Sequence, residues 1–165
     1  MRLKIVFFLL LYLFLSFYNP EIVGENEEII LTKESGIKIP EIYLDAEICK
    51  LERDVCLDDG VWMKYFDERG NILLTGHSFT IVPFGAGVFY ALSDLKEGDI
   101  ISIWLDESLV YIVEDVFVVS RYDLDIENFE KLENTLVLYT CFPLWSASQR
   151  IVVRATLCNL CEYEL

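Results

Sequence analysis

Apolar residues are concentrated in one run near the start of the chain. Residues 1–18 contain two basic side chains and then an apolar stretch over residues 5–17 that only Tyr12 and Ser16 interrupt. As a helix, the 16 residues from position 3 to position 18 are about 24 Å long, somewhat short of a hydrocarbon layer of about 30 Å. This length fits a signal peptide as well as an anchor, but no small-residue cleavage site follows. We expect an N-terminal transmembrane helix over residues 1–18, with a cleaved signal as the alternative.

The charge around this segment predicts its orientation. Its two basic residues lie on the short N-terminal side, which the positive-inside rule places in the cytoplasm. We therefore expect a single-pass protein of the cell membrane whose larger part faces the exterior. Residues 19–36 are polar and acidic without a sustained hydrophobic period, and they predict a stalk.

From residue 37 onward the pattern changes to short runs rich in β-branched and aromatic residues. Strands are predicted at residues 37–44, 46–51, 72–77, 100–105, 110–119, 135–140 and 150–157. This many short strands in about 120 residues predicts a mainly all-β domain, an antiparallel barrel or sandwich. A hairpin turn is predicted at residues 106–108, and one short helix over residues 88–95, where apolar residues share a face.

Composition limits the classes of partner. The chain has 13 basic and 28 acidic residues, a net charge of −15, so nucleic acid is excluded as a partner because binding it requires clustered cations. A hydrophobic content of 54% excludes a disordered chain. We expect one folded domain over residues 37–165.

The chain has five cysteines, and outside the cytoplasm disulfides can form between them. They are Cys49, Cys56, Cys141, Cys158 and Cys161, and the odd number leaves one thiol unpaired unless it bridges two chains. Cys141, between a β-rich run and a proline-containing loop, is the natural unpaired one. Three pairings of the other four are open: Cys49 with Cys56 and Cys158 with Cys161, or either of two crossed arrangements. The alternative is that all four are small buried hydrophobes without disulfides. A four-cysteine metal site depends on a single CxxC motif, and we expect neither a metal nor a cofactor.

Two further residues complete a candidate site with Cys141. His77, the one histidine of the chain, and Arg150 both lie at ends of predicted strands, although a lone histidine or a surface arginine more often has no such role. Arg154 competes with Arg150, because residues four apart on a strand share a face. A thiolate nucleophile, an imidazole that moves a proton and a permanently charged guanidinium together suit acyl transfer.

The sequence resembles the sortase family, the membrane-anchored cysteine transpeptidases of bacterial surfaces. The motifs that carry the resemblance, in the family's order, are IKIPEIYLDAEI, LDDGVW, LTGHS, FYALSDLKEGDIISI, LVLYTC with a proline two residues on, and Arg150 after a short loop. They span residues 37–157. The spacing from Cys141 to Arg150 and the presence of Pro143 look more like the pilin-type or the D and E classes than the housekeeping class. A VxPxD-like turn is replaced by VSRYD, without proline.

The resemblance implies a sortase-like closed barrel of eight strands with one or two short helices, and no cofactor. It implies His77, Cys141 and Arg150 as catalytic residues acting on an LPxTG-like sorting signal of surface proteins through a thioester. The acceptor amine would belong to a peptidoglycan precursor or a pilin lysine, and Thr140 would help to position the substrate. A catalytically silent peptide-binding barrel and a thiol peptidase that releases its product to water are the alternatives.

Two other features have weaker support. Trp145, in the loop between Cys141 and Arg150, either lines the substrate groove or packs in the core. Acidic residues between two predicted strands suit a solvated face better than a calcium site, since they lack calcium-loop spacing. These residues are Asp123, Asp125, Glu127, Glu130 and Glu133. The GxG sequence at residues 85–87 fits a loop that gives the chain slack.

Overall fold

The computed structural model describes residues 35–81, 84–122 and 131–161. The predicted anchor, nearly all of the predicted stalk and four of the five clustered acidic residues lie outside these ranges. Among the helices in the described ranges, none is long and apolar enough to cross a membrane.

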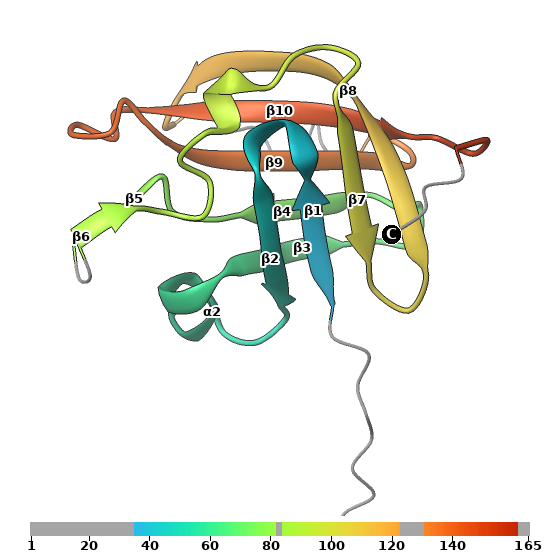
Figure 1. Cartoon of the computed structure of the whole chain (residues 1–165), viewed down its shortest axis with the longest axis horizontal. Coiled ribbons are helices and arrows are strands. Elements are labelled where there is room, and N and C mark those ends of the chain that lie inside the picture. The colour runs from blue at the N-terminus through green and yellow to red at the C-terminus, as the bar shows by residue number, and fades with distance from the viewer. Residues whose placement is uncertain (1–34, 82–83, 123–130, 162–165) are drawn as a thin grey trace, which may run out of the picture. The chain divides into compact units, whose positions relative to one another are not determined.

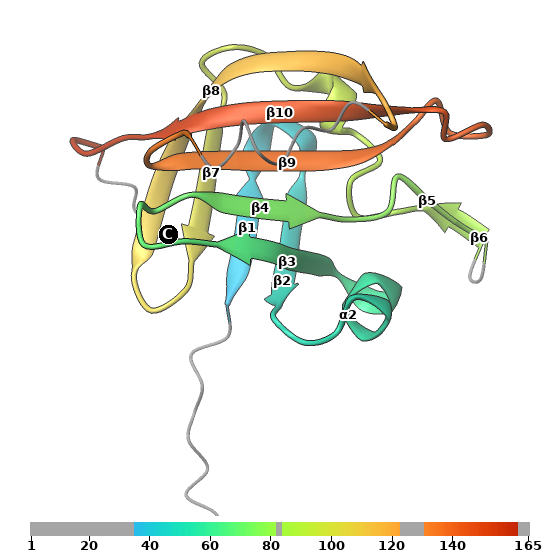
Figure 2. The ribbon, with the colours of Figure 1, turned by 180° about the vertical axis from the view of Figure 1, so that it is seen from behind.

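Eight strands close into a barrel (Figures 1 and 2), in the order β1-β2-β3-β4-β9-β10-β8-β7. Their bounds are β1 Gly36–Ile39, β2 Leu44–Cys49, β3 Val61–Phe66, β4 Ile72–Thr75, β7 Ile100–Trp104, β8 Ser108–Ser120, β9 Thr135–Phe142 and β10 Gln149–Leu157. The expected mainly all-β barrel is confirmed. The expectation that it is antiparallel is wrong at two places, because β2 pairs with β3, and β4 with β9, in parallel.

Short elements connect these strands. They are the helix α2 Arg53–Asp59, the 3-10 helices η1 Pro40–Ile42 and η2 Leu92–Asp94, and a separate hairpin of β5 Phe79–Ile81 and β6 Phe84–Ala86. Figures 1 and 2 show that α2 and this hairpin lie at the same end of β3 and β4. The loop from β9 to β10 lies at that end too.

Local chemistry explains why two of the observed elements differ from the predicted ones. The strand predicted over residues 37–44 is two strands, because Pro40 has no N–H donor for the ladder and starts η1 instead. The helix predicted over residues 88–95 is a series of turns followed by η2. There the backbone N–H of Phe89 donates to the carbonyl of His77, 2.9 Å away, which ties this segment to a neighbouring loop.

The core fills the inside of the barrel. Side chains alternate between the interior and the exterior along each strand, so inward positions are apolar. Buried core residues from the strands include Ile37, Ile39, Leu44, Ile48, Val61, Ile72, Leu74, Ile101, Ile103, Leu136, Leu138, Ile151, Val153 and Ala155. Tyr111 is also buried, and burial, followed by the negative charge of Glu107, raises its pKa to about 12.

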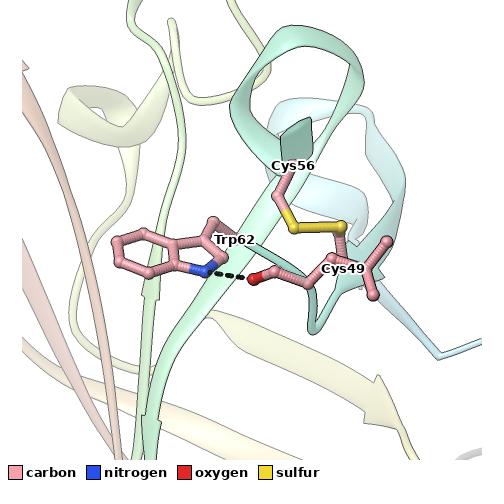
Figure 3. The surroundings of a disulfide bond; sticks show 4 residues. Cys49, Cys56 and Trp62 are labelled. Atoms are coloured by element: carbon pink, nitrogen blue, oxygen red, sulfur yellow. Dashed lines mark hydrogen bonds between the residues drawn. A yellow bond between two sulfur atoms is a disulfide. The ribbon is translucent and has the colours of Figure 1, made fainter. Parts of the chain in front are cut away.

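Four cysteines form two local disulfides, Cys49–Cys56 and Cys158–Cys161. The local pairing is therefore right, and the crossed pairings and the four-cysteine metal site are wrong. The first bridge joins the end of β2 to α2 (Figure 3). Beside it, the indole Nε1 of Trp62 on β3 donates to the carbonyl of Leu51, 3.2 Å away. Together these bonds tie α2 to β2 and tie the segment between β2 and α2 to β3.

Candidate active site

The pairing of three neighbouring strands brings the predicted trio together. In the parallel pair, Ile72 of β4 lies beside Leu136 of β9 and Thr75 beside Tyr139, an offset of 64 residues. The next link is the hydrogen bond from the Thr140 hydroxyl to the carbonyl of Gly76, and His77 and Cys141, also 64 residues apart, follow these two residues. On the other side of β9, Cys141 and Arg150 are direct partners in the antiparallel pair of β9 and β10. Cys141 is thus between the imidazole-bearing segment and the guanidinium-bearing strand.

A surface pocket of about 430 Å³ contains all three residues. His77, Cys141 and Arg150 line it together with Thr75 and Tyr139, and each member of the trio is half-buried. Within the described residues Cys141 is the one cysteine without a disulfide partner. A nucleophilic thiol therefore faces a cavity that is open to a substrate.

His77 is held by close backbone packing. Its carbonyl accepts a hydrogen bond from Phe89, and the backbone N–H of Gly87 donates to Ser78, 3.1 Å away. A Cβ atom at Gly87 would overlap the carbonyl group and the Cβ of His77, so only glycine fits. The interpretation of residues 85–87 as slack is therefore wrong, because this glycine lets the loop lie directly against His77.

Thr140 does not line the pocket. It is 3% exposed, and its hydroxyl donates to the carbonyl of Gly76, 2.8 Å away. Its side chain points into the barrel because Tyr139 and Cys141, its neighbours on β9, face the pocket. The hydroxyl of Thr140 thus connects β9 to Gly76, the residue before His77, by a hydrogen bond.

Arg150 is oriented by the loop that precedes it. Its Nη1 donates to the carbonyls of Ala147 and Gln149, at 2.9 and 2.7 Å. No carboxylate of the described residues forms an ion pair with it, so its charge is available to a ligand. Arg154 is different, since it pairs with Glu114 and Asp115 and does not line the pocket.

Trp145 lies in the loop between β9 and β10 but outside the pocket lining. It is 79% exposed, which is not the core position that was the alternative. Its ring packs on Phe79, with the centroids 5.1 Å apart and the planes inclined by 56°. This contact joins the loop to the β5–β6 hairpin.

The pocket is strongly cationic in an acidic protein. Besides Arg150, its lining includes Arg53 of α2, Lys64 of β3 and Arg121 after β8. Among the side chains that the structure describes, no aspartate or glutamate lines it. Because its charges are of one sign, the pocket attracts anionic groups.

A family model for the sortase domain matches residues 37–158. The chain belongs to the sortase family. Sortases are cysteine transpeptidases, the enzyme class to which this chain is thereby assigned. No curated protein matches the sequence.

Solved sortases have the same fold. Sortase A from Corynebacterium diphtheriae is 28% identical, with a TM-score of 0.69, over 79% of this chain and 63% of that one. A lid mutant of sortase A from the same organism is 28% identical, with a TM-score of 0.65, over 78% and 71%. Sortase C-1 from Actinomyces oris is 24% identical, with a TM-score of 0.65, over 76% and 73%. The chain spans less than two thirds of the first of these proteins.

Sequence reasoning missed several residues of this sortase's pocket. Trp62 and Lys64 belong to β3, which was not predicted, although alternation over residues 61–66 would have placed both on one face. Arg53 and Arg121 lie at element ends, where no periodic pattern marks them. Gly87 had a visible GxG signal, but its contact with His77 depends on the fold.

Proposed function

We propose that this sortase cleaves an LPxTG-like sorting signal of surface proteins and transfers the acyl part to an amine. The observation that carries the proposal is the unpaired thiol of Cys141 in a cationic pocket, between the segment of His77 and the strand of Arg150. The family supplies the reaction class, and the pocket supplies the three chemical groups that this class needs.

The first half-reaction forms the acyl-enzyme. The thiolate sulfur of Cys141 attacks the carbonyl carbon of the scissile peptide bond, and a tetrahedral intermediate forms. The guanidinium of Arg150 donates hydrogen bonds to the developing oxyanion or to the substrate backbone. The carbon–nitrogen bond then breaks, and the protonated imidazole of His77 gives its proton to the departing amine. A thioester on Cys141 remains.

The second half-reaction reverses these steps with a different amine. The acceptor nitrogen attacks the thioester carbonyl and loses a proton to the now neutral His77. The carbon–sulfur bond breaks, and the thiolate of Cys141 is restored. A peptidoglycan precursor or a pilin lysine is the acceptor we propose, with water as the competing nucleophile.

We further propose that residues 1–18 anchor the enzyme in the cell membrane with the catalytic domain outside. The apolar run and its two basic residues support this placement. The disulfides Cys49–Cys56 and Cys158–Cys161 support it too, since such bonds persist in oxidising compartments.

Product analysis tests the reaction. The full-length enzyme is incubated with LPxTG peptides that vary at x, with and without a glycine-based amine, and products are identified by mass spectrometry. We expect an amine adduct from the wild type and none from Cys141→Ala or Arg150→Gln, while Arg154→Gln retains activity. Cleavage without any adduct would indicate a thiol peptidase. Binding without cleavage would indicate a silent peptide-binding barrel.

A further inference from the structure

The order of the strands indicates from which side of the pocket the amine substrate approaches. Across the sheet the order is β10, β9, β4 and β3, with α2 beside β3. Arg150 therefore lies on one side of Cys141 and His77 on the other. Both the departing amine and the entering amine exchange a proton with His77, so both approach from the side of β4 and β3.

The part of the pocket beyond His77 is a wall made of Arg53, Leu57, Trp62 and Lys64. We call these four residues the acceptor wall. Arg53 and Leu57 come from α2, and Trp62 and Lys64 come from β3. The Cys49–Cys56 disulfide ties α2 to the end of β2, and the bond from Trp62 to Leu51 ties β3 to the segment that precedes α2 (Figure 3).

The charges of this wall have no counter-ions among the side chains that the structure describes. Among those side chains, neither Arg53 nor Lys64 forms an ion pair, and no acidic one lines the pocket. The ammonium of Lys64 lies over the ring of Tyr139, 5.5 Å from its centroid. Tyr139 is two residues from Cys141 on the same face of β9, so this ammonium is held near the thiol.

We propose that the acceptor wall selects an amine acceptor that carries a carboxylate close to its reacting nitrogen. This inference rests on the proposed transpeptidase function and names the chemistry of its second substrate. Arg53 and Lys64 bind the carboxylate, which places the amine beside His77. Leu57 and the indole of Trp62 supply an apolar surface for the carbon chain between the two groups.

Two matched acceptors test this selectivity. The full-length enzyme cleaves a fluorogenic LPxTG peptide in the presence of Gly-Asp-amide or Gly-Asn-amide, which have nearly the same shape but differ in charge. The ratio of the two adducts is measured by mass spectrometry. We expect about fivefold more adduct from the aspartate acceptor, since two half-exposed ion pairs contribute this order of preference. Raising the salt concentration should reduce the ratio.

Variants show which residues produce the ratio. Arg53→Gln/Lys64→Gln should reduce it to about one, and Lys64→Glu should reverse it, because the charge that selects the carboxylate is removed or inverted. Lys96→Gln, an exposed lysine outside the pocket, should leave it unchanged. The ratio compares two adducts made by the same variant. A loss of folded protein reduces both adducts and leaves their ratio unchanged.

The outcomes separate this inference from the proposed function. Equal adducts from both acceptors, or a preference that survives Arg53→Gln/Lys64→Gln, would overturn the carboxylate selectivity while the transpeptidase function stands. No adduct from either acceptor would overturn the proposed function, and this inference with it.

Discussion

Replacing Gly87 by alanine tests how His77 is held. The added methyl group would overlap the carbonyl group and the Cβ of His77, so either the loop or the histidine must move. Gly85, two residues earlier, is the matched control, because a Cβ there meets no atom within 4 Å. Both substitutions remove the same conformational freedom from the unfolded chain, so their difference reports contacts in the folded protein.

The size of the effect follows from the overlap. Forcing a methyl group into a packed site costs about 1–3 kcal/mol, which for a protein of this length lowers the melting temperature by about 2–4 °C per kcal/mol. Displacing a proton-transfer group by about 1 Å costs on the order of 100-fold in rate. Gly87→Ala should therefore lower kcat/KM by about 100-fold and the melting temperature by several degrees.

Peptide cleavage and thermal unfolding of the full-length chain measure the two effects. Gly85→Ala should match the wild type in kcat/KM and unfold at the same temperature or slightly above it. Equal activity of Gly87→Ala and Gly85→Ala would refute the reasoning that Gly87 positions His77. A loss of stability without a loss of activity would show that the loop moves and the histidine does not.

Three further variants test the support of the site and of the barrel core. Thr140→Val should destabilise the fold by about 1–3 kcal/mol in urea unfolding and lower kcat more than it raises KM, because the carbonyl of Gly76 loses its hydroxyl donor. Cys49→Ala/Cys56→Ala should lower the free energy of unfolding by about 2–3 kcal/mol and weaken selection among acceptor amines. Because Tyr111 stays neutral to a pKa of about 12, stability should be intact below pH 10 and fall between about pH 10 and 12, less steeply in Tyr111→Phe.

Matched variants show what would contradict each expectation. Thr140→Ser keeps the hydroxyl, so a similar loss in both Thr140 variants would point to packing of the methyl group. Cys158→Ala/Cys161→Ala removes the other bridge, far from the acceptor wall, and an equal change in acceptor selection would refute the role of the first. A Tyr111→Phe protein that loses stability at alkaline pH as steeply as the wild type would refute the role assigned to this phenol.

Local patterns predicted much of this fold. The apolar runs at residues 72–77 and 150–157 correspond closely to β4 and β10. The order of the strands could not be predicted in this way, because a run of β-branched residues does not show which strand it pairs with. The parallel pairing of β4 with β9 joins segments 64 residues apart and follows from the closure of the barrel.

The candidate site was predicted only as far as its motifs extend. The sequence indicated His77, Cys141 and Arg150, and the structure places them in one pocket, while their catalytic roles stay predictions. Alternation along β9 already implies that Thr140 and Cys141 face opposite ways. Arg53 and Lys64 were not foreseeable as a pair, since their proximity depends on a disulfide and on a strand pairing.

Because side chains alternate along β9 and β10, one face of each strand contributes to stability and the other to the pocket. Leu138, Thr140 and Ile151 point inward and maintain the barrel, whereas Cys141 and Arg150 point outward to the pocket. Substitutions at the outward positions that line the pocket and are not catalytic, such as Tyr139, should therefore alter substrate preference at little thermodynamic cost. A mutational library confined to such positions should yield altered specificities without loss of folded protein.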